Sequence, residues 1–180
     1  MDGKWKFVEN QLLMNSMQGA LQRANVYSDP TADTDPNRRL LRDELAGLLR
    51  EMVRKYSKTV TSEFHEQNIQ KIADSLTSKF AASGILRNDR FRIGIAQKVL
   101  NLYLKYLWCL GKVETPPHCP FDYGVIAQLP LEQQERERLR WTELDRMEDY
   151  RALVDAGRRM IATTGHSSLS EWELDEFNAR

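Results

Sequence analysis

The stretch between Gly94 and Leu110 constrains the fold more than any other part of the chain. When it is drawn as a helix, apolar and aromatic residues occupy nearly every side: Val99, Leu100, Leu102, Tyr103, Leu104, Tyr106, Leu107, Trp108, Cys109 and Leu110. A helix that is apolar all round is a buried helix. Its polar residues Lys98, Asn101 and Lys105 follow one another at steps of three and four, so they share one face. We therefore expect a central helix with other helices packed around it.

Apolar residues recur at helical spacing along most of the remaining chain. Helices are expected over residues 4–26, from Asp35 to about residue 53, over residues 62–82 and in the C-terminal third. The segment from Ser28 to Pro36 is polar and contains two prolines, which is typical of a linker. The chain is therefore divided into an N-terminal arm with its linker, residues 1–34, and a helical domain, residues 35–180. No strand pair is indicated, so the predicted fold is an all-α helical bundle around one central buried helix.

Several residues are typical of helix N-termini. Asp35 precedes a proline, an arrangement that caps free amides and suits the first turn. Asp122 stands where an N-cap would precede a short apolar run. Thr142 and Asp145 resemble a capping box that would open the next long helix. Ser168 or Ser170 is expected to cap the last helix.

Composition excludes several classes of protein. The 180 residues carry 26 basic and 26 acidic side chains, so the chain does not coat nucleic acid through bulk charge. Two cysteines, Cys109 and Cys119, make neither a disulfide framework nor an iron–sulfur site. With His118 they offer three metal ligands where zinc needs about four, so we expect no metal and no cofactor. No signal peptide or membrane span is indicated, and we expect a cytoplasmic protein.

One region departs from this neutrality. Residues 85–113 contain a single acid, Asp89, and six basic residues: Arg87, Arg90, Arg92, Lys98, Lys105 and Lys112. Such a local excess is the footprint of a contact with a phosphate backbone. Alternatively, these side chains cover the ends of a buried helix and reach to water. The lysines would then pair with acids near the C-terminus: Glu171, Glu173, Asp175 and Glu176.

A family resemblance sharpens the first interpretation. The sequence Gly94-Ile95-Ala96-Gln97-Lys98, an apolar helix and then Pro120-Phe121-Asp122-x-x-Val125-x-x-x-Leu129 resembles the core signature of the helix-hairpin-helix DNA glycosylases and AP lyases. The archaeal 8-oxoguanine glycosylases are the subgroup it resembles most. The similarity covers residues 85–130. Ala96 stands where the family usually has a second glycine, and Asp122 follows Lys98 by 24 residues, a longer gap than in most of the family.

The resemblance implies roles for residues of this sequence. Lys98 would attack the sugar of a flipped nucleotide and form a Schiff base, and Asp122 would stay ionised to support positive charge on the sugar. The amides of Gly94, Ile95, Ala96 and Gln97 would hold a DNA phosphate, helped by Arg87, Arg90 and Arg92. The extruded base would lie among Tyr103, Trp108 and His118. The implied partner is DNA, in a repair reaction.

The alternative function is a non-enzymatic helical adaptor. It would bind a protein partner through residues 4–26, or bind DNA without chemistry. An enzyme requires Lys98 and Asp122 to face one cleft that solvent reaches. An adaptor instead predicts an exposed apolar patch and a Lys98 that is occupied by a salt bridge.

Overall fold

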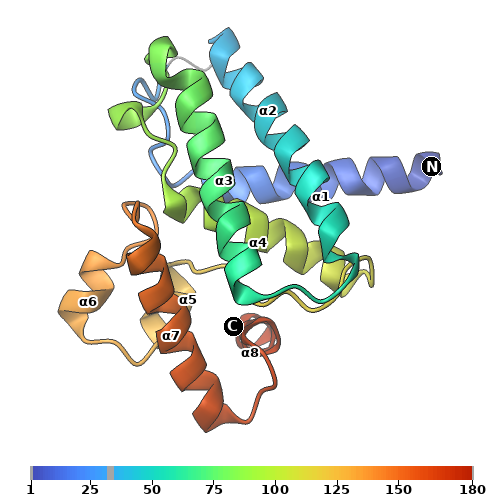
Figure 1. The fold of residues 1–180 in the computed structure, drawn as a ribbon, viewed down its shortest axis with the longest axis vertical. Helices are drawn as coiled ribbons and strands as arrows, with labels where there is room; N and C mark the ends of the chain where they lie inside the picture. The colour runs from blue at the N-terminus through green and yellow to red at the C-terminus, as the bar shows by residue number, and fades with distance from the viewer. Residues whose placement is uncertain (1, 32–34, 180) are drawn as a thin grey trace.

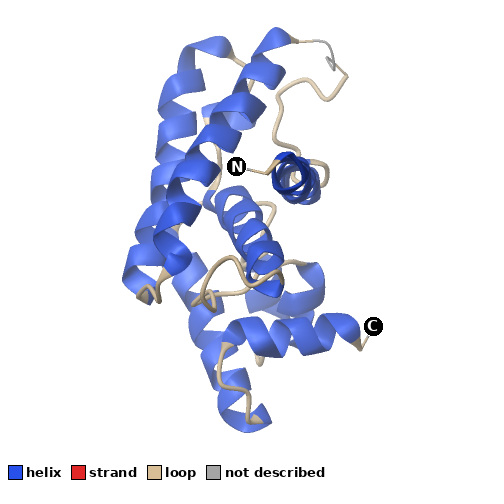
Figure 2. Cartoon of the chain, turned by 90° about the vertical axis from the view of Figure 1, so that its right-hand side faces the viewer, coloured by secondary structure: helices blue, strands red, loops and turns tan. Residues whose placement is uncertain are grey.

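The structure, a computed structural model, describes residues 2–31 and 35–179, and across them it confirms the all-α fold (Figure 2). Within those ranges the only strand-like pairing is an isolated bridge between Tyr27 and Leu86. None of the described helices is long and apolar enough to cross a membrane. The α-helices are α1 (Gly3–Leu21), α2 (Pro36–Val53), α3 (Ser62–Phe80), α4 (Ile93–Cys109), α5 (Tyr123–Gln128), α6 (Gln133–Arg138), α7 (Met147–Thr164) and α8 (Leu169–Asn178).

Helix α4 is the central buried helix that the sequence predicts. Every residue from 93 to 101 is buried, including the polar Gln97, Lys98 and Asn101. α1, α3 and α7 all pack against it. In Figure 1 helices α1, α2 and α3 lie at one end of the molecule and α5 to α8 gather at the other. α4 is therefore the element that both ends share.

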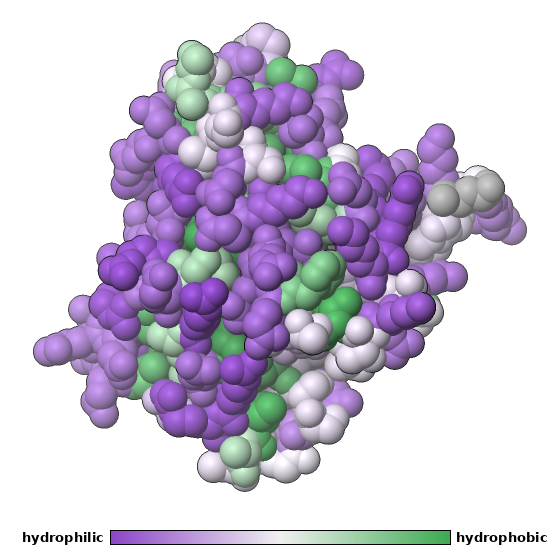
Figure 3. All heavy atoms as spheres, viewed as in Figure 1, coloured by the Kyte–Doolittle hydropathy of each residue, from purple (hydrophilic) through white to green (hydrophobic). Residues whose placement is uncertain are grey.

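The N-terminal helix contributes to the same core. Leu13, Ala20 and Leu21 of α1 are buried, and Gly19 allows a close approach because a Cβ there would lie 2.9 Å from Leu102. The chain after α1 is tied to the connector before α4 by backbone hydrogen bonds, among them Ser28 N to Ile85 O at 3.0 Å. The predicted boundary at residue 34, and part of the predicted linker, lie outside the described residues. The face seen in Figure 3 is mostly polar, with apolar atoms in small patches.

Most predicted helix starts are found where they were expected. The side chains of Asp35, Asp122 and Ser168 each accept a backbone N–H in the first turn of the helix that follows. The predicted capping box at Thr142 and Asp145 is wrong, because α7 begins only at Met147 and has no side-chain cap. Asp145 instead accepts hydrogen bonds from Arg90 and from the backbone of Ile93. The Asp145 carboxylate, which the local sequence predicts as a helix cap, thus binds tertiary partners instead.

Candidate functional site

Lys98 and Asp122 meet in the structure although 24 residues separate them. The Nζ atom of Lys98 lies 2.8 Å from Oδ2 of Asp122. The Lys98 side chain is only 10% exposed, whereas that of Asp122 is 35% exposed. The pair therefore lies just below the surface and reaches solvent on the carboxylate side.

The Asp122 carboxylate is held by a second contact. Its Oδ1 atom accepts a hydrogen bond from the backbone N–H of Val125 at 3.0 Å, so Asp122 caps α5 while it faces Lys98. A helix N-terminus favours negative charge. Both the cap and the lysine thus stabilise the ionised form of the carboxylate.

An aromatic side chain that the sequence analysis missed completes the surroundings of Lys98. Nζ lies 5.1 Å from the centre of the buried Trp141 ring, in a cation–π arrangement. Tyr123 contacts the same ring edge-on, with 6.0 Å between the ring centres, and is itself about half exposed. In the sequence Trp141 directly follows a run of charged residues, so it was not expected to lie at this site. The one available signal for it was an aromatic residue at the end of such a run.

Gly94 allows the Trp141 segment to lie so close to α4. A Cβ on Gly94 would fall 1.8 Å from the carbonyl oxygen of Trp141, and the Gly94 N–H donates to Leu144 O at 2.8 Å. No residue with a side chain fits this contact without displacing backbone. The glycine that the resemblance assigned to phosphate binding therefore serves the packing of residues 141–144.

The other predicted phosphate ligands on this helix are also engaged inside the chain. The N–H groups of Ile95 and Ala96 both donate to Arg92 O at 3.1 Å, and residues 93–97 are all buried. The side chain of Gln97 bonds to the backbone of Phe121. The start of α4 thus differs from the expectation, because it presents no amide of Gly94, Ile95 or Ala96 to a phosphate arriving from solvent.

The three predicted DNA-contacting arginines have carboxylate or carbonyl partners. Arg87 pairs with Glu143 at 3.5 Å, and Arg90 pairs with both Asp145 and Asp74. Arg92 is buried and donates to the carbonyl oxygens of Ala24 and Asn25. Burial lowers the pKa of the Arg92 guanidinium. Acids from α3 and from residues 143–145 thus balance Arg87 and Arg90, whereas Arg92 is engaged by backbone carbonyl groups.

The three residues predicted to form a base pocket are not gathered around Lys98. Tyr103 is buried and its hydroxyl donates to Glu9 of α1 at 3.4 Å. His118 is buried and bonds to Ser62 and Tyr150, while Trp108 is half-buried on α4.

A chain of buried polar groups runs from the Lys98 site into the core. Gln97 clamps the residue before Asp122, donating to Phe121 O at 2.8 Å and accepting from Phe121 N at 3.2 Å. Asn101 donates to Gln97 at 3.2 Å and to the Tyr150 hydroxyl at 3.3 Å. The same hydroxyl lies 2.8 Å from Nδ1 of His118. This network holds the backbone that carries the catalytic candidate Asp122.

Two histidines of this buried region are neutral by environment. His65 and His118 stack edge to face with ring centres 4.9 Å apart. Burial lowers the pKa of His65 to about 4, against a smaller raising contribution from Asn101. Burial also holds the pKa of His118 well below its usual range, and the neighbouring His65 adds to this. Among the described residues no group of three or more His, Cys, Asp or Glu could hold a metal ion.

Lys105 forms the second ion pair of α4. Its Nζ lies 2.7 Å from Glu173 of α8, and the two side chains are only 11% and 7% exposed. The alternative interpretation of the lysines, pairing with C-terminal acids, thus holds for Lys105, whereas Lys98 pairs with Asp122. Burial raises the pKa of Glu173, and Lys105 opposes this.

Comparisons with known proteins add no family. A scan against protein-family models, a search of curated proteins and a search of solved structures each found no match.

Proposed function

We propose that the chain acts on DNA in the manner of a helix-hairpin-helix glycosylase/AP lyase, with Lys98 as nucleophile and Asp122 as its carboxylate partner. The observation that carries the proposal is the 2.8 Å contact between these two groups, with Asp122 at the N-cap of α5. In this proposal α3, the connector and α4 would form the helix-hairpin-helix element.

The chemistry would give the two groups different roles. An amine attacks carbon only when it is uncharged, so Lys98 would first release a proton to solvent while Asp122 stays ionised. The Lys98 nitrogen then bonds to the sugar C1′ while the bond from C1′ to the base breaks and the base leaves with the electron pair. The carboxylate remains in place to stabilise positive charge on the sugar. The exposed Tyr123 offers a stacking surface beside the pair.

Access to Lys98 sets the conditions for this reaction. With a tenth of its side chain exposed, Lys98 must separate from Asp122 before a sugar can reach it, and the approach is from the more exposed carboxylate. DNA phosphates would also have to replace carboxylates as partners of Arg87 and Arg90. We therefore expect weak DNA binding that falls steeply as salt is raised.

Borohydride trapping tests the proposal directly. Duplexes carrying 8-oxoguanine, uracil or an abasic site are incubated with the protein and reduced, and a covalent adduct is sought on a denaturing gel. We expect an adduct with the wild type and none with Lys98→Gln.

The matched control is Lys105→Gln, which removes the other paired lysine of α4. Both variants are first checked for a cooperative thermal transition. An adduct that persists in Lys98→Gln assigns the chemistry to another amine, and the absence of an adduct on all three substrates rejects the enzymatic proposal.

The second candidate function is that of a helical adaptor for a protein partner. Lys98 is occupied by a salt bridge, as that function predicts, and large apolar side chains of α1 are exposed, namely Phe7, Val8 and Met14.

A further inference from the structure

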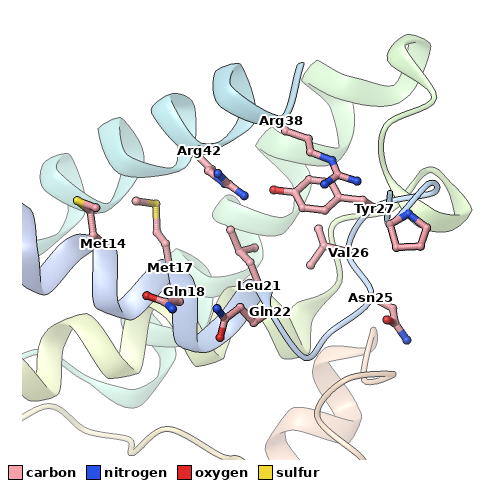
Figure 4. Close-up of a pocket in the computed structure, with 11 residues that line it drawn as sticks. Met14, Met17, Gln18, Leu21, Gln22, Asn25, Val26, Tyr27, Arg38 and Arg42 are labelled. Carbon is pink, nitrogen blue, oxygen red and sulfur yellow. The ribbon is translucent and has the colours of Figure 1, made fainter. Parts of the chain in front are cut away.

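A groove of about 460 Å³ lies between the C-terminal half of α1, the chain after it and the first turns of α2 (Figure 4). It is remote in sequence from Lys98 and Asp122, neither of which lines it. Its lining residues are Met14, Met17, Gln18, Leu21, Gln22, Asn25, Val26, Tyr27, Pro30, Arg38 and Arg42.

Part of the groove lining is apolar and adaptable. Met14 is 56% exposed, Met17 is half-buried beside it, and Leu21 and Val26 are buried beneath. Methionine is flexible and polarisable and is common at surfaces that accept apolar side chains of different shapes. The volume suits one or two large apolar side chains of a partner.

The charged side chains among the described residues that line the groove are basic. Two arginines and no carboxylate line this described part. Arg38 lies 4.2 Å above the Tyr27 ring and donates to Asp29 O, so its guanidinium is fixed at one end of the groove. Arg42 is exposed and has no hydrogen bond or ion pair to the described residues. Figure 4 shows its side chain directed toward the groove between α2 and α1.

We propose that this groove binds an acidic amphipathic segment of a partner protein. One or two large apolar side chains would enter between Met14, Met17 and Leu21, and an adjacent Asp or Glu would pair with Arg42. Charge complementarity selects this occupant, since the charged side chains among the described lining residues are both arginines and repel a basic segment. A nucleic acid is disfavoured, because Tyr27 is the one aromatic ring among the described lining residues and it is covered by Arg38, so no ring is open for a base to stack on. The inference holds with either candidate function.

Selection from a displayed library of random 12-residue peptides tests the proposal. The full-length wild-type protein is the target, and Arg42→Glu is the counter-target. We expect enriched peptides that combine a bulky apolar residue with neighbouring Asp or Glu. Measured by fluorescence anisotropy, they should bind Arg42→Glu and Met14→Lys at least about tenfold more weakly than wild type.

The matched control is Arg159→Glu, which reverses another exposed arginine, on α7. It should bind the selected peptides as wild type does. Enriched peptides that bind wild type and Arg42→Glu equally, peptides that are basic, or a selection without enrichment would each overturn the proposal. So would concentration-dependent dimers in sedimentation that Arg42→Glu abolishes, because the occupant would then be a second copy.

Discussion

The two lysines of α4 stand on one face, seven residues apart, and each meets a carboxylate from later in the chain. Lys105 and Glu173 are both almost completely enclosed, so their ion pair joins α8 to α4 and offers no route to a ligand. Lys98 is equally enclosed, but its partner Asp122 is one-third exposed and also caps α5. Burial of the amine alone therefore does not distinguish a structural ion pair from a candidate catalytic one. The two pairs differ in the exposure of the carboxylate and in its second role as a helix cap.

The largest effect is expected at the enclosed pair. Lys105→Met leaves Glu173 buried without its cation, and removing one partner of a buried pair costs about 3–5 kcal/mol of the free energy of unfolding. Lys98→Met should lower the free energy of unfolding by only about 1 kcal/mol, because Asp122 still caps α5 and is still one-third exposed to solvent. Urea unfolding at pH 7 measures both. Equal losses would show that the two pairs are energetically alike.

A smaller effect on the free energy of unfolding is expected from pH. It arises from the buried His65 and His118 beneath Asn101, a residue that lies between the two lysines on α4. His65 has its pKa lowered from 6.5 to about 4 on folding, so the unfolded chain binds a proton first as the pH falls. The stability it contributes is complete above pH 6.5 and is lost as the pH falls toward 4, by about 3 kcal/mol. Glu173 acts in the opposite direction, because burial raises its pKa.

The test compares urea unfolding of wild type and His65→Gln at pH 7.5 and pH 4.5. The variant removes the titrating ring and should lose clearly less stability between these two pH values than wild type does. His118→Gln, at the neighbouring ring, should behave in the same way. An unchanged dependence on pH in both variants would mean that folding does not shift the pKa of these histidines.

The smallest of the three effects concerns the segment that covers Lys98. Gly94→Ala places a Cβ against the backbone of Trp141, and the resulting overpacking should cost about 1–3 kcal/mol. The resulting displacement of the Trp141 segment should also change the tryptophan fluorescence. Gly47→Ala is the control, since a Cβ there meets nothing within 4 Å and Gly47 is exposed on the outer face of α2. A fully stable Gly94→Ala would show that residues 141–144 do not pack on α4 as described.

Local sequence was sufficient for most of the helices and their caps. The apolar surround of α4 and the caps at Asp35, Asp122 and Ser168 are properties of neighbouring residues, which is why they could be read without a structure. The juxtaposition of Lys98 with Asp122 came from resemblance. The wrong cap at Asp145 and the missed Trp141 share one cause. Each residue takes its role from a contact with α4, to Ile93 and to Lys98, that is distant in the chain.

What the sequence determined by itself is an all-α chain with one central buried helix, because helical periodicity and all-round apolarity act over a few turns. The tertiary structure alone decided which charges meet. It paired Arg87 and Arg90 with acids, gave Gly94 a packing role and left Arg42 facing an apolar groove. Electrostatic partners depend on distances of a few ångströms between distant segments, and the spacing of residues along the chain does not contain those distances.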